Sequence, residues 1–170
     1  MLTMEKYHFV PCGYDIDIAT ATNNQGASIN MSNYQHCMFI VQYLDLGAQP
    51  HRLYVHSGAT DGAMTSEVRF TWSKSTVAQA ALLTDTATQD LFTAPTKTTT
   101  ATPYLAVAAD QDYFVYLVDV DVEDMDLANN EKWLTIDFQD TADAGATGQA
   151  IVIAMLTPRH AYESHATALT

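Results

Sequence analysis

The chain has 170 residues, of which 7 are Lys or Arg and 20 are Asp or Glu, so its formal net charge is −13. So few cations argue against binding to bare nucleic acid or to an anionic membrane surface, because both depend on Lys and Arg. Apolar residues make up 48% of the chain, which is enough for a core, and no apolar run approaches the roughly 20 residues of a spanning helix. The N-terminal sequence lacks the pattern of a signal peptide. We therefore predict one domain over residues 1–170, synthesised in a cytoplasm.

Segments of strand-like sequence follow one another along the chain, separated by turns rich in Asn, Asp and Gly. The predicted strands are Tyr14–Ala19, Tyr34–Leu46, His51–His56, Glu67–Ser73, Asp112–Val122, Lys132–Gln139 and Gln149–Leu156. Two of them, Glu67–Ser73 and Lys132–Gln139, alternate an apolar face with a polar face, as half-buried antiparallel strands do. Only Ser75–Ala87 is compatible with a helix. We predict an all-β antiparallel sandwich with a jelly-roll topology, and a closed barrel is the alternative.

One segment, Thr84–Pro103, differs from the rest because nine of its 20 residues are Thr. A loop of this length and composition is either a flexible connection or an extended arm that contacts another surface. Arg159, one of three Arg residues, is a further candidate, because it can pair with an acidic residue within the fold or across a subunit boundary. The candidate protein-contact residues are Thr96, Lys97, Thr98, Thr99, Thr100, Ala101, Thr102 and Arg159.

The negative charge is concentrated in one part of the chain. Residues Asp110–Asp143 contain 11 acidic residues and one Lys. Such a segment either keeps an exposed edge soluble or attracts a basic protein face. An EF-hand starting at Asp119 is rejected, because Asp124 and Asn130 occupy the positions that require Gly and Glu. A looser calcium site formed by Asp121, Asp124 and Asp126 stays open.

The remaining polar residues form no pattern with a specific chemistry. The six His residues lack zinc-site spacing, and the sequence has no GxSxG, Walker or GxGxxG motif. We therefore predict a protein that is not an enzyme and that has no catalytic residues, metal or cofactor. The two cysteines, Cys12 and Cys37, do not make a disulfide framework, although a bridge between them stays open. The Tyr and Trp residues fit core positions better than a carbohydrate-stacking platform.

Three stretches of the chain resemble the head decoration (cement) proteins of tailed bacteriophages. The first is GASINMSNYQHCMFIVQYLDLG (Gly26–Gly47), in which a polar segment with Asn-Tyr leads into an apolar strand and a closing Gly. The second is YFVYLVDVDVEDMDLANNEKWLTIDFQDT (Tyr113–Thr141), an acidic strand followed by a turn and another strand. The third is AIVIAMLTPRHAYE (Ala150–Glu163), an apolar strand that ends in Pro-Arg.

This resemblance implies a jelly-roll protein of the virion that forms a homotrimer on the outer surface of the capsid. Its partner would be the major capsid protein, and its function would be to clamp neighbouring subunits of the head against internal DNA pressure. Synthesis in the host cytoplasm agrees with the composition. The alternative, which rests on the aromatic residues, is a carbohydrate-binding β-sandwich displayed on a virion or cell surface.

Overall fold

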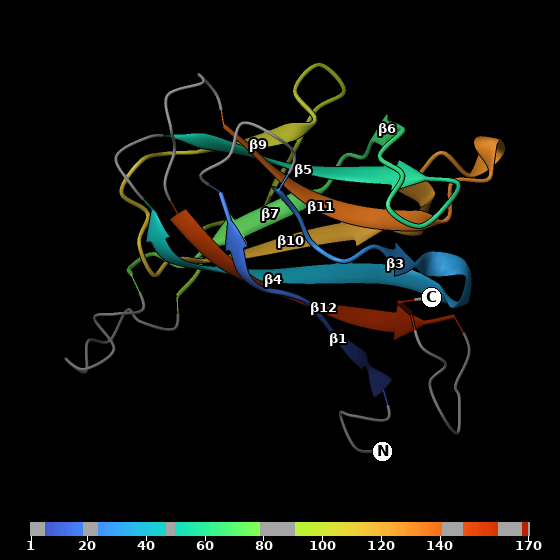
Figure 1. Ribbon diagram of the computed structural model, residues 1–170, viewed down its shortest axis with the longest axis horizontal. Coiled ribbons are helices and arrows are strands. Elements are labelled where there is room, and N and C mark those ends of the chain that lie inside the picture. The colour runs from blue at the N-terminus through green and yellow to red at the C-terminus, as the bar shows by residue number, and fades with distance from the viewer. Residues whose placement is uncertain are drawn as a thin grey trace.

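The computed structural model describes residues 6–18, 24–46, 50–78, 91–140, 148–159 and 168–169. In these residues two antiparallel sheets pack face to face, and Figure 1 shows β5 and β11 of one sheet above β4 and β12 of the other. Sheet A contains, in spatial order, β1 (His8–Asp17), β12 (Gly148–Pro158), β4 (Tyr34–Leu46), β10 (Val115–Asp121), β7 (Thr71–Lys74) and β8 (Thr96–Lys97). Sheet B contains, in spatial order, β2 (Asn24–Gln25), β11 (Trp133–Asp140), β5 (His51–Gly58) and β6 (Ser66–Glu67). Two further strands pair with it: β3 (Ile29–Asn30) pairs with β11, and β9 (Tyr104–Val107) pairs with β5.

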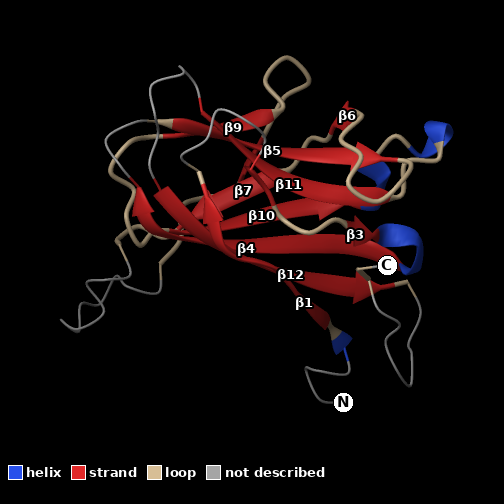
Figure 2. Ribbon diagram, viewed as in Figure 1, coloured by secondary structure: helices blue, strands red, loops and turns tan. Residues whose placement is uncertain are grey.

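Strands dominate the described residues, as Figure 2 shows. Within these residues, three short 3-10 helices lie in the connections: η1 (Met31–Asn33), η3 (Val122–Asp124) and η4 (Leu127–Asn129). In the described part of the chain, no helix has the length and hydropathy needed to cross a bilayer.

The strand order is that of a jelly roll. The first strand, β1, pairs with the last, β12, and the neighbouring pairs are β12 with β4 and β4 with β10. In sheet B the corresponding order is β2, β11, β5 and β9. The chain therefore passes from one sheet to the other at most of its connections, which is the double Greek-key path of this fold. The predicted all-β sandwich with jelly-roll topology is confirmed, and the structure is not the closed barrel.

Two short strands share one edge of β5. Strand β6 pairs with the end of β5 at His56 and Ser57, and β9 pairs with its beginning at His51–Tyr54. Between β6 and β9 the chain crosses to sheet A, where it adds β7 and β8 beyond β10. The prediction of one strand over Glu67–Ser73 was therefore wrong. The alternating apolar pattern of this segment comes from Val68 and Phe70, which are buried in the connection that leads from sheet B to sheet A.

Most other strand predictions agree with the structure. Strand β4 has the predicted bounds, and β5, β11 and β12 differ from theirs by one or two residues at an end. Strand β10 starts three residues later than predicted, because Asp110 and Tyr113 have left-handed backbone (φ 56° and 60°) and form a turn before it. Residues 79–90 lie outside the described residues, so most of the helix-compatible segment Ser75–Ala87 and part of the Thr-rich segment are not described.

The core lies between the sheets and contains several of the aromatic residues. Tyr43 of β4 is fully buried; its hydroxyl lies 2.7 Å from Nε2 of the equally buried His51, and its ring makes edge contacts with Tyr116 and Phe138. Burial raises the pKa of Tyr43 well above its usual range. The prediction that Tyr and Trp residues serve the core is confirmed for Tyr34, Tyr43 and Tyr116, whereas Tyr54 and Trp133 are buried on the outer face of sheet B.

Both cysteines are free thiols inside the core. Cys37 is fully buried, and Cys12 is 4% exposed. Burial raises the pKa of Cys12 to about 12 and that of Cys37 well above its usual value. Because the thiolate is the nucleophile, we expect neither thiol of the native protein to react with iodoacetamide at neutral pH, and both to react in denaturant. Mass spectrometry after labelling measures this, and rapid native labelling of Cys37 would contradict the described core.

Candidate protein-interaction surface

The outer face of sheet A carries apolar side chains. Along β4, β10 and β12 every second residue is buried between the sheets, and the residues between them face outward and are partly or largely exposed. In a sandwich this outer face is ordinarily polar. Here it includes Phe9 and Ile153, which expose 39% and 38% of their surface. We define the apolar patch as Phe9, Met38, Ile40, Leu117, Ile153 and Met155.

Strand register makes the apolar patch continuous. Ile40 of β4 lies directly between Ile153 of β12 and Leu117 of β10. In the next row, Met155 lies between Phe9 and Met38. The side chains come from four neighbouring strands, so they form one surface instead of scattered exposed residues. Continuous exposed apolar surface of this kind marks interaction sites in folded proteins.

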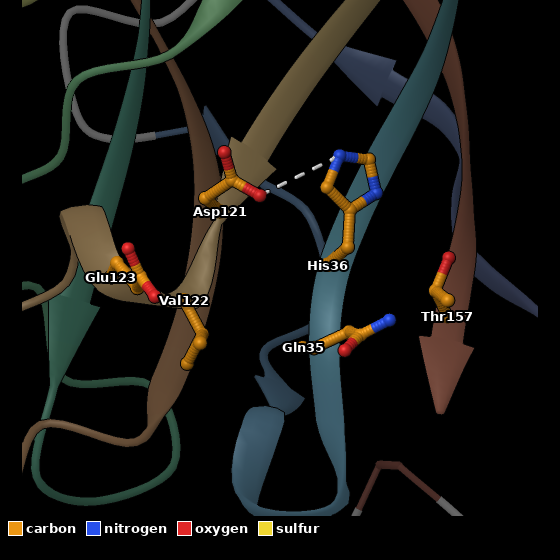
Figure 3. A pocket seen from close by; sticks show the side chains of 6 residues that line it. All are labelled: Gln35, His36, Asp121, Val122, Glu123 and Thr157. Atoms are coloured by element: carbon orange, nitrogen blue, oxygen red, sulfur yellow. Dashed lines mark ion pairs between the residues drawn. The ribbon is translucent and has the colours of Figure 1, made fainter. Parts of the chain in front are cut away.

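One end of the apolar patch is acidic. Asp119 of β10 lies beside Met38, and the row that follows contains Thr157, His36 and Asp121. Nε2 of His36 lies 2.7 Å from Oδ1 of Asp119 and 4.0 Å from Oδ1 of Asp121. Figure 3 shows His36 and Asp121 reaching toward one another from β4 and β10, with Thr157 of β12 on the other side of His36.

The acidic end holds His36 in its charged form over a wider pH range than usual. The hydrogen bond to Asp119 raises the pKa of His36 above 6.5, the Asp119 and Asp121 charges add to the increase, and partial burial opposes it. The His36–Asp119 pair therefore contributes its full stability below the ordinary His pKa and loses it as the pH rises through the raised pKa. Since His36 is partly exposed, this contribution is modest.

Two hollows flank His36 on this face. The first has a volume of about 440 Å³ and is lined by Gln35, His36, Asp121, Val122, Glu123 and Thr157 (Figure 3). The second has a volume of about 300 Å³, and its apolar walls include Met38, Trp72, Pro95 and Leu117. His36 lines both of them. The surface thus offers one polar, acidic depression and one largely apolar depression side by side.

The contact residues predicted in the Thr-rich segment lie at the edge of sheet A. Thr96 and Lys97 form β8 and pair with Trp72 and Thr71 of β7. The buried Thr98 accepts a hydrogen bond from the Phe70 amide (3.0 Å). The exposed residues Thr99, Thr100, Ala101 and Thr102 make a turn closed by a bridge between Thr99 and Thr102. The described part of this segment therefore lies along the sandwich.

Arg159, the other predicted contact residue, follows β12 at the acidic end of sheet A. Its amide donates to the Asn33 carbonyl (3.0 Å), and its Nε donates to the Tyr34 carbonyl (2.9 Å). These bonds join β12 to the start of β4. The structure thus gives Arg159 contacts with backbone carbonyls inside the fold.

The calcium hypothesis receives no support from the arrangement of the acidic residues. Asp124 pairs with Arg69 (3.0 Å) and with Lys97 (2.8 Å), and Asp126 accepts hydrogen bonds from the amide and side chain of Asn129. Within the described ranges, no group of three or more His, Cys, Asp or Glu side chains is positioned to hold a metal ion.

A second polar group lies on the outer face of sheet B, but it is buried. Asp137 is fully buried; its Oδ2 lies 3.5 Å from Nε2 of His56 and accepts a hydrogen bond from the side-chain Nε2 of Gln139 (2.7 Å). Tyr54 stacks on His56, with ring centroids 5.6 Å apart. The prediction of an exposed polar face for Lys132–Gln139 was therefore wrong, because Trp133, Thr135 and Asp137 are covered. A covered face is not available to a partner, so the outer face of sheet A is the candidate site.

Sequence reasoning missed the apolar patch. The signal was present, because Cys37–Val41 and Ala150–Leu156 are continuous apolar runs, and such runs indicate strands covered on both faces. A comparison with models of known protein families finds no match, and a comparison with curated protein sequences finds none either.

Proposed function

We propose that the protein is a virion structural protein, a capsid decoration (cement) protein that binds the outside of a tailed-phage head. It bridges neighbouring major capsid protein subunits as a homotrimer. The observation that carries this proposal is the apolar patch on the outer face of a jelly-roll sheet. The sequence resemblance to decoration proteins supplies the class of partner.

The properties of this surface suit attachment to another protein. Apolar residues at the centre and polar residues at the rim are the usual composition of a protein interface. The apolar patch has this arrangement, with His36, Asp119 and Asp121 on one side. A small contact repeated at many positions on a shell, and within a trimer, gives strong overall attachment through multivalency.

The proposal is tested with heads prepared without the protein. We expect purified wild-type protein to co-sediment with them and to raise the temperature at which DNA becomes accessible to a dye. Ile153→Asp places a charge in the middle of the apolar patch and should weaken binding by roughly 30-fold or more. Leu127→Asp is the matched control, because Leu127 is 49% exposed on η4, outside the apolar patch.

The outcomes separate the parts of the proposal. Heads that take up no wild-type protein would overturn the decoration function. Equal binding of wild type and Ile153→Asp would show that another surface makes the contact. A monomeric mass in sedimentation velocity would overturn the homotrimer.

A further inference from the structure

We infer that the outer face of sheet A docks a protein segment in which a Lys or Arg side chain is adjacent to an apolar side chain, with the cation in the hollow beside His36. The apolar side chain occupies the neighbouring hollow bounded by Trp72 and Leu117. This inference rests on the proposed function, for which it names the chemistry of the partner.

Charge complementarity favours a basic partner. The first hollow is lined by Asp121 and Glu123, and Asp119 lies next to it against His36. Among the described residues, the cations at this end are engaged elsewhere, because Lys97 and Arg69 both pair with Asp124 and Arg159 donates to the Tyr34 carbonyl. When His36 is neutral, a docked cation in the first hollow therefore meets the two carboxylates that line it, Asp121 and Glu123, and Asp119 in the lining of the second hollow adds to the attraction. Attraction of this kind sets the orientation and specificity of a complex.

Shape and polarity favour an apolar neighbour for that cation. Met38, Trp72, Pro95 and Leu117 form the apolar part of the second hollow, which also has Asp119 in its lining and shares His36 with the first. Met38 and Leu117 also belong to the apolar patch, so the second hollow opens onto it. A partner segment that extends from the acidic end across β4 and β10 contacts both hollows.

His36 makes this docking depend on pH. The groups facing it are Asp119 and Asp121 of β10 and Thr157 of β12, and Glu123 of η3 lines the same hollow. A proton on His36 and a cation in the hollow compete for the same carboxylates. Docking therefore weakens as the pH falls through the raised pKa of His36, and a docked cation lowers that pKa in return.

The test uses two peptides as probes, acetyl-Gly-Leu-Lys-Leu-Gly-amide and the same peptide with Glu in place of Lys. NMR of the labelled protein follows the methyl groups of Met38, Ile40 and Leu117 and the ring of His36. We expect the Lys peptide to shift these signals, to bind roughly tenfold more weakly at about pH 5.5 than at about pH 9, and to lower the His36 pKa. The Glu peptide should produce none of these effects.

Matched variants complete the test. His36→Gln should bind the Lys peptide with little dependence on pH, and Asp121→Asn should bind it several-fold more weakly at about pH 9. Glu67→Gln changes the net charge by the same amount on sheet B and should bind like the wild type. Equal effects of the Lys and Glu peptides, no shifts with either, or equal losses in Asp121→Asn and Glu67→Gln would overturn the inference. Because no heads are used, failure here is distinguishable from failure of the proposed function.

Discussion

Replacing Phe39 with Ala is expected to lower the free energy of unfolding by about 3–5 kcal/mol, the usual cost of such a truncation in a packed core. Phe39 is fully buried on β4, opposite Ala154 of β12 and Val118 of β10. Both neighbours are themselves fully buried on central strands, so the surrounding backbone has little freedom to close the cavity.

Urea denaturation followed by circular dichroism measures this loss. Met38→Ala is the control, because Met38 is the next residue of the same strand but points to the outer face and is partly exposed. Its truncation should cost about 1 kcal/mol, since it removes less buried surface. Equal losses for the two variants would contradict the assignment of Phe39 to the core side of sheet A.

Replacing Glu131 with Ala is expected to cost about 3 kcal/mol, the value of two hydrogen bonds to a charged group. Glu131 is 3% exposed and precedes β11. Its Oε2 accepts from Ser57 Oγ (2.5 Å) of β5, and its Oε1 accepts from Ser66 Oγ (3.0 Å) of β6. The carboxylate therefore links three strands at one end of sheet B, and its removal leaves both hydroxyls without these bonds.

Glu131→Gln distinguishes hydrogen bonding from charge. A side-chain amide can accept from one Ser hydroxyl and donate to the other, so this variant should lose less than about 1 kcal/mol. The comparison is made by thermal and urea denaturation of both variants. A Gln variant as unstable as the Ala variant would show that the negative charge itself, and not the pair of hydrogen bonds, holds this end of the sheet.

The fold was predictable from local sequence because the core strands carry strong local signals. Tyr34–Leu46 has no Gly or Pro and contains many β-favouring residues, and its predicted and observed bounds agree. The turn sequences marked the ends of β5, β11 and β12 in the same way. What local sequence could not give was the crossing at Val68–Phe70, because an alternating pattern looks the same in one strand and in a chain that turns between two sheets.

The candidate surface was harder to predict because it depends on register. His36 and Asp119 are far apart in the sequence, and only the pairing of β4 with β10 brings them within 2.7 Å. The same pairing aligns Ile40 with Leu117, and β12 adds Ile153. Asp119 and Asp121 are two residues apart in a strand and therefore share a face, but the sequence contained nothing that showed which histidine lies opposite them.

The outermost strands of both sheets determine how the molecule can polymerise. On one side of sheet A, β1 contains Pro11 and has register shifts between Pro11 and Gly13 and between Gly13 and Ile16; on the other side, β8 has two residues. In sheet B the described outer strands β2, β3 and β6 also have two residues each, and β9 has four. Prolines, bulges and very short strands prevent a second chain from adding along a sheet edge. Growth into cross-β fibres is thereby disfavoured even at high concentration, which leaves the molecule free to associate through a sheet face in complexes of fixed size.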